Sequence, residues 1–270
     1  MSARAARAAI AALSEGAELR TWSLIVTVFG DMARAPGAEV PGPVLSALTR
    51  AIGIRPEAMR VALHRLRKDG WIASRRAGRV SHYFLTDAGR AQSDTATARI
   101  FARHPPAAQS WHVAIAGPQN PPARLALDGA MAAGYVTLAP GAWLGAGPAP
   151  ETLDPGLFVL DGTTLRLPGW LSEALMPPAL TQAYGEFDIV LARVAALLAG
   201  GFDSLSPTDR TAIRVLLVHR WRRLVLRHAD LPDRFFAADW PGVRVRDRVH
   251  SLLDRLGHPS LADVADAIPA

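Results

Sequence analysis

Apolar side chains in the first third of the chain recur three and four positions apart over three stretches, which predicts three successive helices. These helices are expected over residues 19–32, from Pro41 or Pro43 to Ala51, and over residues 56–69. Two strands joined by a tight turn at Ala77-Gly78-Arg79 are predicted next, over residues 71–76 and 80–85. Thr86 is placed to cap a fourth helix, which runs to about residue 103. This order of helices and hairpin is that of a winged helix-turn-helix.

The pattern changes after His104-Pro105-Pro106, which predicts a linker. A strand, a helix and three further strands follow, expected over residues 111–116, 124–133, 135–138, 142–144 and 157–160. This order favours a small α+β domain of the ferredoxin-like type. From Trp170 onward the spacing is helical, with long helices expected over residues 183–199, 206–227 and 243–256.

The predicted fold class is therefore α+β and mostly helical, in three consecutive parts. A winged helix-turn-helix occupies residues 1–103, the ferredoxin-like domain residues 104–168, and a helical C-terminal domain residues 169–270. A length of 270 residues suits two or three such domains. The Ala-rich residues 1–12 are expected to form a short basic arm or a leading helix turn.

Composition excludes several classes of protein. The chain contains no cysteine, which excludes disulfide frameworks, cysteine-based zinc sites and cysteine nucleophiles. No apolar run approaches the ~20 residues that a membrane-spanning helix needs, and the N-terminus lacks the apolar segment and cleavage site of a signal peptide. We therefore expect a cytoplasmic protein that does not associate with membranes.

The charge of the chain is concentrated in one short segment. Between residues 55 and 82 there are eight basic and two acidic residues, a net charge of +6, which equals the net charge of the entire chain. The basic residues are Arg55, Arg60, Arg65, Arg67, Lys68, Arg75, Arg76 and Arg79. Such a concentrated field is typical of a surface that binds a polyanion. The alternative is an ordinary solvated charged face.

In a helix-turn-helix, the second helix of the pair enters the major groove of DNA and presents its first turns to base edges. The helix expected over residues 56–69 holds that position, and Arg60 and His64 lie on its outward face. Arg67 and Lys68 lie further along and are predicted to contact phosphates. The predicted DNA-binding set is completed by Arg55 and Arg65 and by the hairpin residues Arg75, Arg76 and Arg79, which suit the adjacent minor groove or its phosphates. For any one of them, the alternative is a surface arginine in a salt bridge.

A second Arg-rich segment lies near the C-terminus, at residues 218–227. Its mixture of arginine and apolar side chains suits a pocket for an anionic, partly apolar ligand. The candidate effector-binding residues are Arg220, Trp221, Arg222, Arg223 and Arg227, with Trp240 from the following turn. The alternative is a basic helix packed on the core, with its arginines paired to Asp230, Asp233 or Asp239.

Several segments resemble the PaaX family, regulators of phenylacetic acid degradation. The resemblance is carried by residues 21–31, 60–66, 69–71, 85–90, 216–223, 230–232 and 238–242. It implies the three-part architecture and a homodimeric repressor that binds a double-stranded DNA operator and is released by an aryl-CoA thioester such as phenylacetyl-CoA. Arg220 and Trp221 depart from the family, which often has an acidic or aromatic pair at this point.

The leading hypothesis is a ligand-responsive repressor of an aromatic-acid catabolic operon. The alternative is a winged-helix DNA-binding protein without a small-molecule effector, which acts architecturally or through a protein partner. An enzyme fused to a DNA-binding domain is a third class, but the sequence contains no Gly-x-Ser-x-Gly elbow, no Ser/His/Asp grouping and no histidine run with ligand spacing. We therefore expect no enzymatic activity, cofactor or metal.

Overall fold

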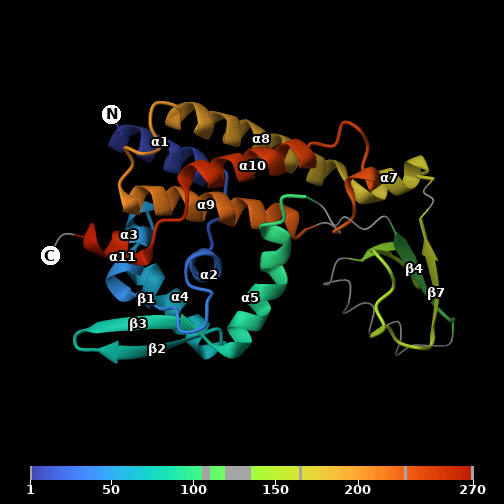
Figure 1. Ribbon diagram of the computed structural model, residues 1–270, viewed down its shortest axis with the longest axis horizontal. Coiled ribbons are helices and arrows are strands. Elements are labelled where there is room, and N and C mark those ends of the chain that lie inside the picture. Colours follow the sequence, from blue (N-terminus) through green and yellow to red (C-terminus); the bar gives the residue numbers. More distant parts are fainter. Residues whose placement is uncertain (1, 105–109, 119–134, 164–165, 228–229, 269–270) are drawn as a thin grey trace. The chain divides into compact units, whose positions relative to one another are not determined.

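The computed structural model describes residues 2–104, 110–118, 135–163, 166–227 and 230–268 (Figure 1). The chain divides into two compact units, each built from segments that are discontinuous in sequence. Unit 1 comprises Met1–Phe101, Glu186–Arg223 and Val245–Ala270, and unit 2 comprises Ala102–Gly185 and Leu224–Arg244. The sequence predicted three consecutive domains. That these three segments fold independently stays a prediction. None of the described helices is long and apolar enough to cross a membrane.

Unit 1 begins with five helices and a hairpin. The helices are α1 (Ser2–Ser14), α2 (Thr21–Met32), α3 (Gly42–Ala51), α4 (Pro56–Lys68) and α5 (Asp87–Ile100). Strands β2 (Ile72–Ala77) and β3 (Val80–Leu85) form the hairpin, and the short strand β1 (Val40–Pro41) pairs with β3, so the sheet order is β1-β3-β2. The order of helices and strands predicted for this part of the chain is therefore present, with ends shifted by a few residues.

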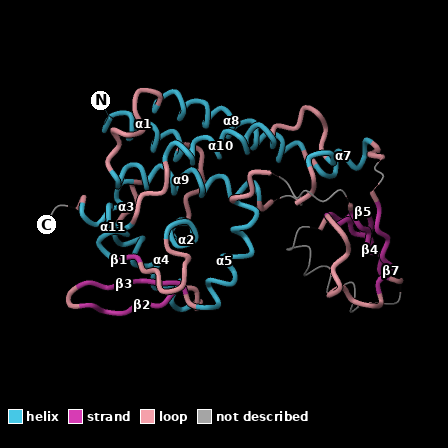
Figure 2. The backbone as a smooth tube through the Cα atoms, in the orientation of Figure 1, coloured by secondary structure: helices cyan, strands magenta, loops and turns pink. Residues whose placement is uncertain are grey.

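Helix α2 lies at the centre of unit 1. All seven residues from Ser23 to Phe29 are buried, because neighbouring helices surround α2 on several sides. Figure 2 shows α2 end-on, close to α4, α5 and α9 (Pro207–Val225). Helix α9 is buried in the same way from Thr211 to His219. The later helices are α8 (Pro178–Leu198), α10 (Gly242–Leu256) and α11 (Leu261–Asp266).

The N-terminus is more ordered than the expected basic arm or helix turn. Helix α1 has 13 residues. Its buried residues are Ala6, Ala9, Ile10, Ala12 and Leu13. Because three of these five side chains are alanines, the apolar face of the helix stood out little in the sequence. This small face lets α1 pack closely within unit 1.

Local sequence accounts for the ends of α4 and α5. Helix α4 begins at Pro56, whose fixed backbone suits the first turn, and the chain leaves it through Gly70, which has a left-handed φ of 72°. Thr86 caps α5, because its Oγ1 accepts a hydrogen bond from the backbone N–H of Gly89 at 3.0 Å. The same hydroxyl donates to the carbonyl oxygen of Gly70 at 2.5 Å. The predicted cap is confirmed, and it also ties α5 to the end of α4.

Unit 2 contains a four-stranded antiparallel sheet. Its strands are β4 (Trp111–Ala116), β5 (Val136–Ala139), β6 (Ala142–Ala146) and β7 (Leu157–Gly162), in the order β5-β6-β4-β7. Strand β6 lies between β4 and β5, as in a split βαβ unit, and the helix predicted over residues 124–133 lies outside the described residues. Residues 147–156, where a ferredoxin-like fold has its second helix, form a loop.

The sheet of unit 2 buries Ala114 and Trp143 on one face. His112 shares that face and is held from both ring nitrogens, by the carbonyl of Gly147 and the hydroxyl of Tyr135, each at 2.9 Å. His112 is therefore a core residue of the sheet with both ring nitrogens hydrogen-bonded. Unit 2 also contains helix α7 (Gly169–Leu175) and a short 3₁₀ turn (Asp233–Phe235).

The close approach of α5 to the chain after α4 generates a first prediction. A Cβ at Gly89 would lie 2.1 Å from the carbonyl oxygen of Trp71, whereas a Cβ at Gly185, also inside a helix, would meet nothing within 4 Å. We expect Gly89→Ala to lower the free energy of unfolding by about 2 kcal/mol, because a backbone must move to relieve the overlap. Gly185→Ala is the matched control and should be neutral or stabilising by up to about 1 kcal/mol.

Urea unfolding of both variants and the wild type measures these changes in the free energy of unfolding. Equal effects of the two substitutions would show that the contact between α5 and Trp71 is not tight.

Candidate nucleic-acid interface

Helix α4 separates its two faces sharply. Met59, Ala62, Leu63 and Leu66 are buried, and they pack towards α2 and α3. The sulfur of Met59 also accepts a hydrogen bond from the hydroxyl of Thr49 on α3 at 3.4 Å. Since this face anchors the helix, the opposite face is presented to solvent as a rigid surface.

The outward face of α4 is polar except at one position. Val61 is 70% exposed and lies among Arg60, His64 and Lys68, which are also exposed. Because Val61 is exposed, this β-branched apolar side chain does not pack in the core. Val61 is not among the residues predicted to bind DNA, because valine is typical of a core position, although its place between the buried Met59 and Ala62 in the helical period puts it on the outward face.

Two arginines on α4 have acidic partners within the same helix region. Arg60 donates to Glu57 at 2.9 Å, and Arg65 donates to Asp69 at 3.4 Å. The Arg65 guanidinium also lies 5.3 Å from the ring centroid of Trp22. All four charged side chains are about half to three-quarters exposed, and such ion pairs contribute only ~0–1 kcal/mol. Both arginines can therefore exchange these partners for an external anion at little cost.

The hairpin places its arginines in two different situations. Arg75 donates to both carboxylate oxygens of Glu39, at 2.5 and 2.7 Å, and His82 lies 3.3 Å from the same carboxylate. The hydrogen bond from Arg75 is the main reason why the pKa of Glu39 is lowered. Arg76 and Arg79 are exposed. Within the described residues they form no ion pair, as is also true of Arg55, Arg67 and Lys68 on and before α4. The basic residues predicted to bind DNA thus divide into those that have an acidic partner and those that have none among the described residues.

The arginines predicted to bind an effector instead hold the N-terminal part of unit 1. Arg220 donates to the carbonyl oxygens of Leu13 and Glu15, both at 3.2 Å, at the end of α1. Arg222 donates to the carbonyl of Ser23 and the hydroxyl of Thr27 on α2, at 3.3 and 3.1 Å. Arg223 donates to the backbone and side-chain oxygens of Glu18, at 2.6 and 2.7 Å. The three side chains therefore reach three different segments.

The aromatic members of that predicted set are buried. Trp221 is 1% exposed, and its indole N–H donates to the carbonyl of Ile100 at 2.7 Å. In unit 2, Trp240 stacks on Phe236 with ring centroids 5.2 Å apart. Arg227 is exposed in the turn after α9. Much of the segment is therefore a basic helix packed on the core, which is the alternative considered for it. The acidic partner of Arg223 is Glu18, which was not among the partners that the alternative named.

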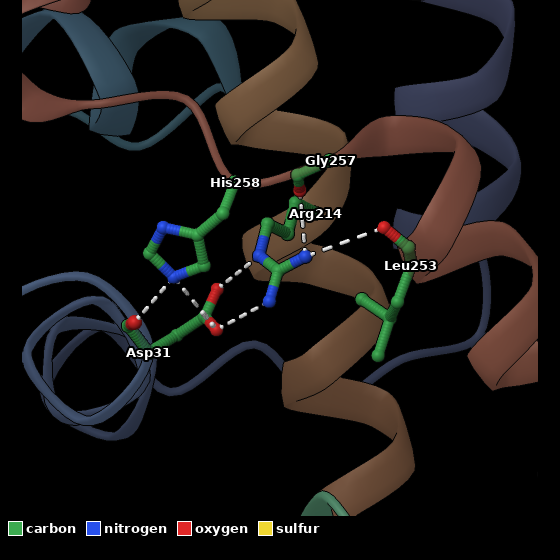
Figure 3. Close-up of polar contacts among 5 residues, drawn as sticks. All are labelled: Asp31, Arg214, Leu253, Gly257 and His258. Atoms are coloured by element: carbon green, nitrogen blue, oxygen red, sulfur yellow. Dashed lines mark hydrogen bonds and ion pairs between the residues drawn. The ribbon is translucent and has the colours of Figure 1, made fainter.

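A buried ion pair joins α2 to the C-terminal helices (Figure 3). Arg214 on α9 donates to both oxygens of Asp31, at 2.7 and 2.8 Å, and to the carbonyl of Gly257 at 2.7 Å. His258 closes the cluster, with its Nε2 2.8 Å from the carbonyl oxygen of Asp31. The side chains of Asp31 and Arg214 are 1% and 8% exposed. The cluster fixes the C-terminal end of α2, the helix on which α4 packs.

The cluster shifts the protonation of two of its members. Burial alone would raise the pKa of Asp31, but the hydrogen bonds from His258 and Arg214 and the charge of Arg214 outweigh burial and lower it. The hydrogen bond to Asp31 is the main cause that raises the pKa of His258. Both shifts favour the charged forms, so the cluster is most stable with carboxylate and imidazolium together.

Comparisons with known proteins match both ends of the chain. The family model described as PaaX-like protein matches residues 20–89, and the model described as PaaX-like protein C-terminal domain matches residues 177–265. The transcriptional repressor PaaX of Escherichia coli (strain K12) is 27% identical over 263 residues, which cover 90% of this chain and 83% of that protein. A solved structure, the uncharacterized protein Rv0674 from Mycobacterium tuberculosis, has a similar fold, with a TM-score of 0.50 at 20% identity, covering 89% of this chain and 96% of that one.

The Asp31 cluster generates a pH prediction. Because the folded pKa of His258 is raised, its contribution to stability is complete below the unfolded value of about 6.5 and is lost as pH rises through the folded pKa. We expect the stability advantage of the wild type over His258→Gln to be larger near pH 6 than near pH 8. Urea unfolding at both pH values measures this advantage. The contributions of the other titrating groups cancel, because both proteins contain them.

His64→Gln serves as the control, because His64 is exposed on α4 and forms no ion pair within the described residues. The difference in the free energy of unfolding between the wild type and His64→Gln gives the reference for replacing an exposed histidine at each pH. An advantage of the wild type over His258→Gln that is independent of pH would contradict the proposed coupling.

Proposed function

Because the chain belongs to the PaaX-like family, we propose that it is a transcriptional repressor that binds DNA through an N-terminal winged helix-turn-helix formed by α2 to α5 and the β2–β3 hairpin. The observation that carries this proposal is the outward face of α4, which exposes Arg60, His64, Arg67 and Lys68 on a helix anchored by its buried side. The hairpin adds exposed cations within the same unit. A rigid cationic helix next to a cationic hairpin suits a duplex groove and its phosphates.

In this proposal the residues on α4 have distinct roles. Arg60 leaves Glu57 and donates to a guanine in the major groove, and His64 donates to a base or a phosphate. Val61 contacts the methyl group of a thymine, the base feature that an apolar side chain can recognise. Arg67 and Lys68 neutralise phosphates further along the helix.

The hairpin and the flanking residues position the protein on the backbone. Arg76 and Arg79, which are exposed and unpaired within the described residues, reach the adjacent minor groove or its phosphates. Arg75 supports the hairpin through Glu39 and contributes less charge to DNA. Arg55 and Arg65 complete the cationic rim of α4.

We propose further that the repressor acts as a homodimer on a palindromic operator. One helix-turn-helix reads few base pairs, and paired modules on a two-fold symmetric site are the usual solution. The Leu-rich C-terminal helices are the proposed interface. Two chains per operator are therefore expected in the binding experiment below.

The proposed effector is an aryl-CoA thioester such as phenylacetyl-CoA, as the family resemblance implies, and the regulated operon is one of aromatic-acid catabolism. The support comes from the family membership. The alternative, a DNA-binding protein without a small-molecule effector, makes the opposite prediction in an effector titration.

Two arginine substitutions test the proposed DNA interface. Arg60→Ala should remove the preference for one base pair of the half-site, at a cost of about 1–3 kcal/mol on the operator and little on random DNA. Arg79→Ala should weaken binding to both DNAs and reduce the slope of the salt dependence by about 1. Fluorescence anisotropy with an operator selected from genomic fragments, measured over a range of salt concentrations, distinguishes the two effects.

Arg193→Ala is the control, because Arg193 lies exposed on α8 and pairs with Glu15. It should leave binding to both DNAs unchanged. If Arg60→Ala and Arg79→Ala affect operator and random DNA equally, α4 is not the helix that reads the bases.

A titration of the protein–operator complex tests the effector. Phenylacetyl-CoA should release the operator, whereas free CoA and phenylacetate should not, because release requires a ligand that prefers the state with low DNA affinity. Electrophoretic mobility of the operator reports the outcome. Release by no member of the panel would support the effector-free alternative, and release by the free acid alone would contradict the CoA thioester.

A further inference from the structure

The β2–β3 hairpin has two faces that differ in their free charge. Side chains alternate between the faces of a strand, and the register pairs Arg75 with His82 and Arg76 with Ser81. Arg75 and Arg76 therefore project from opposite faces. Arg75 donates to both carboxylate oxygens of Glu39, whereas Arg76 forms no ion pair within the described residues. Of the two arginines, only Arg76 is free to bind an external anion without leaving a partner.

Glu39 is held beside the hairpin by the backbone. It comes directly before β1, which pairs with β3. The side chain of Glu39 is 20% exposed, whereas that of Glu57, the partner of Arg60 on α4, is 71% exposed. Arg75 makes two hydrogen bonds to its carboxylate, at 2.5 and 2.7 Å, and Arg60 makes one, at 2.9 Å. Because paired, parallel hydrogen bonds to a fixed carboxylate hold an arginine firmly, Arg75 is less free than Arg60 to move to a phosphate.

Glu39 determines the net charge of its face of the hairpin. Arg75 is the only arginine on this face of β2, where Ala73 and Ala77 are its neighbours. His82 of β3 also lies on this face, with its Nδ1 3.3 Å from the carboxylate of Glu39. The hydrogen bond from Arg75 lowers the pKa of Glu39, so the carboxylate is ionised near pH 7 and cancels the charge of the arginine. A neutral residue in place of Glu39 would free one cation.

The two faces of the hairpin also differ in the direction that they face. Ile72 and Leu85 pair across the base of the hairpin and are 2% and 3% exposed. Arg76 lies on the same face as Ile72, because positions four apart in a strand share a face. This face is turned towards the helices of unit 1, among which α3 and α4 pack on the hairpin strands. A duplex bound to α4 therefore meets the hairpin from the side of Arg76, and Arg75 lies on the opposite side.

We infer that Glu39 is a specificity-determining residue, because it neutralises the face of the hairpin that an operator does not use. The inference rests on the proposed function. On random DNA no base contacts of α4 fix the orientation of the protein, so either face of the hairpin can meet phosphates. Glu39 prevents a phosphate contact of Arg75 in such complexes. It has little effect on the operator complex, in which the hairpin contacts phosphates through Arg76.

A cycle of charge substitutions in the full chain tests this inference. Fluorescence anisotropy is measured with the selected operator and with a random duplex of the same length. Glu39→Gln keeps the shape of the side chain but frees Arg75, so it should raise the affinity for random DNA by about three- to tenfold at about 100 mM salt and steepen the salt dependence by about one phosphate contact. The affinity for the operator should rise less than about twofold. The double variant Glu39→Gln/Arg75→Gln should lose the gain on random DNA, because the freed cation is absent.

Glu15→Gln is the matched control. It makes the same change in net charge beside Arg193, and α1, which Glu15 follows, lies on the opposite side of unit 1 from the hairpin (Figure 1). The affinity for both DNAs should stay unchanged. A second comparison does not require Glu39→Gln to fold. Arg76→Gln should weaken operator binding by about fivefold, and Arg75→Gln should weaken it less.

Four results would overturn the inference. Glu39→Gln could leave the affinity for random DNA unchanged or lower it, or raise the affinity for the operator by the same factor. The gain could persist in the double variant, or Arg75→Gln could weaken operator binding as much as Arg76→Gln. Each of these results is compatible with DNA binding by the wild type. If the wild type binds neither DNA, the proposed function fails as well, so the two failures are distinguishable.

Discussion

The buried ion pair between Asp31 and Arg214 is the interaction on which the arrangement of unit 1 depends. It joins α2, from the N-terminal region of family similarity, to α9, from the C-terminal region. Removing either partner would leave an uncompensated buried charge, at a cost of about 3–5 kcal/mol. Gly257 and His258 bind the same two residues, so the chain after α10 is fixed at the same point. One ion pair thus sets how three distant segments meet around the helix that supports α4.

The basic residues of α9 extend this connection along the helix. Arg220, Arg222 and Arg223 donate to the end of α1, to α2 and to the segment between them. Because arginine presents several donors in a planar fork, it satisfies the carbonyl oxygens that helix ends leave free. The C-terminal region therefore contacts the scaffold of α4 directly.

The proposed DNA interface carries less free positive charge than its arginine count suggests. Glu57, Glu39 and Asp69 pair with Arg60, Arg75 and Arg65. The pair at Glu39 is the best ordered, since Arg75 donates twice. The exposed pairs on α4 are weak, so Arg60 and Arg65 can leave their acidic partners when DNA binds. Val61 adds an apolar contact that charge counting does not reveal.

The sequence by itself determined the local elements of this protein, including the amphipathic α4, the β2–β3 hairpin and the Thr86 cap, because helical period, turn chemistry and capping depend on residues close together in the chain. It also identified the family, through short segments at both ends. Only the tertiary structure decided the partners of the charged and aromatic side chains. Trp221 binds the backbone of Ile100, Arg75 binds Glu39, and Arg214 binds Asp31, across separations of 121, 36 and 183 residues. Such partners are chosen by how distant helices pack, and no periodicity in the chain records that choice.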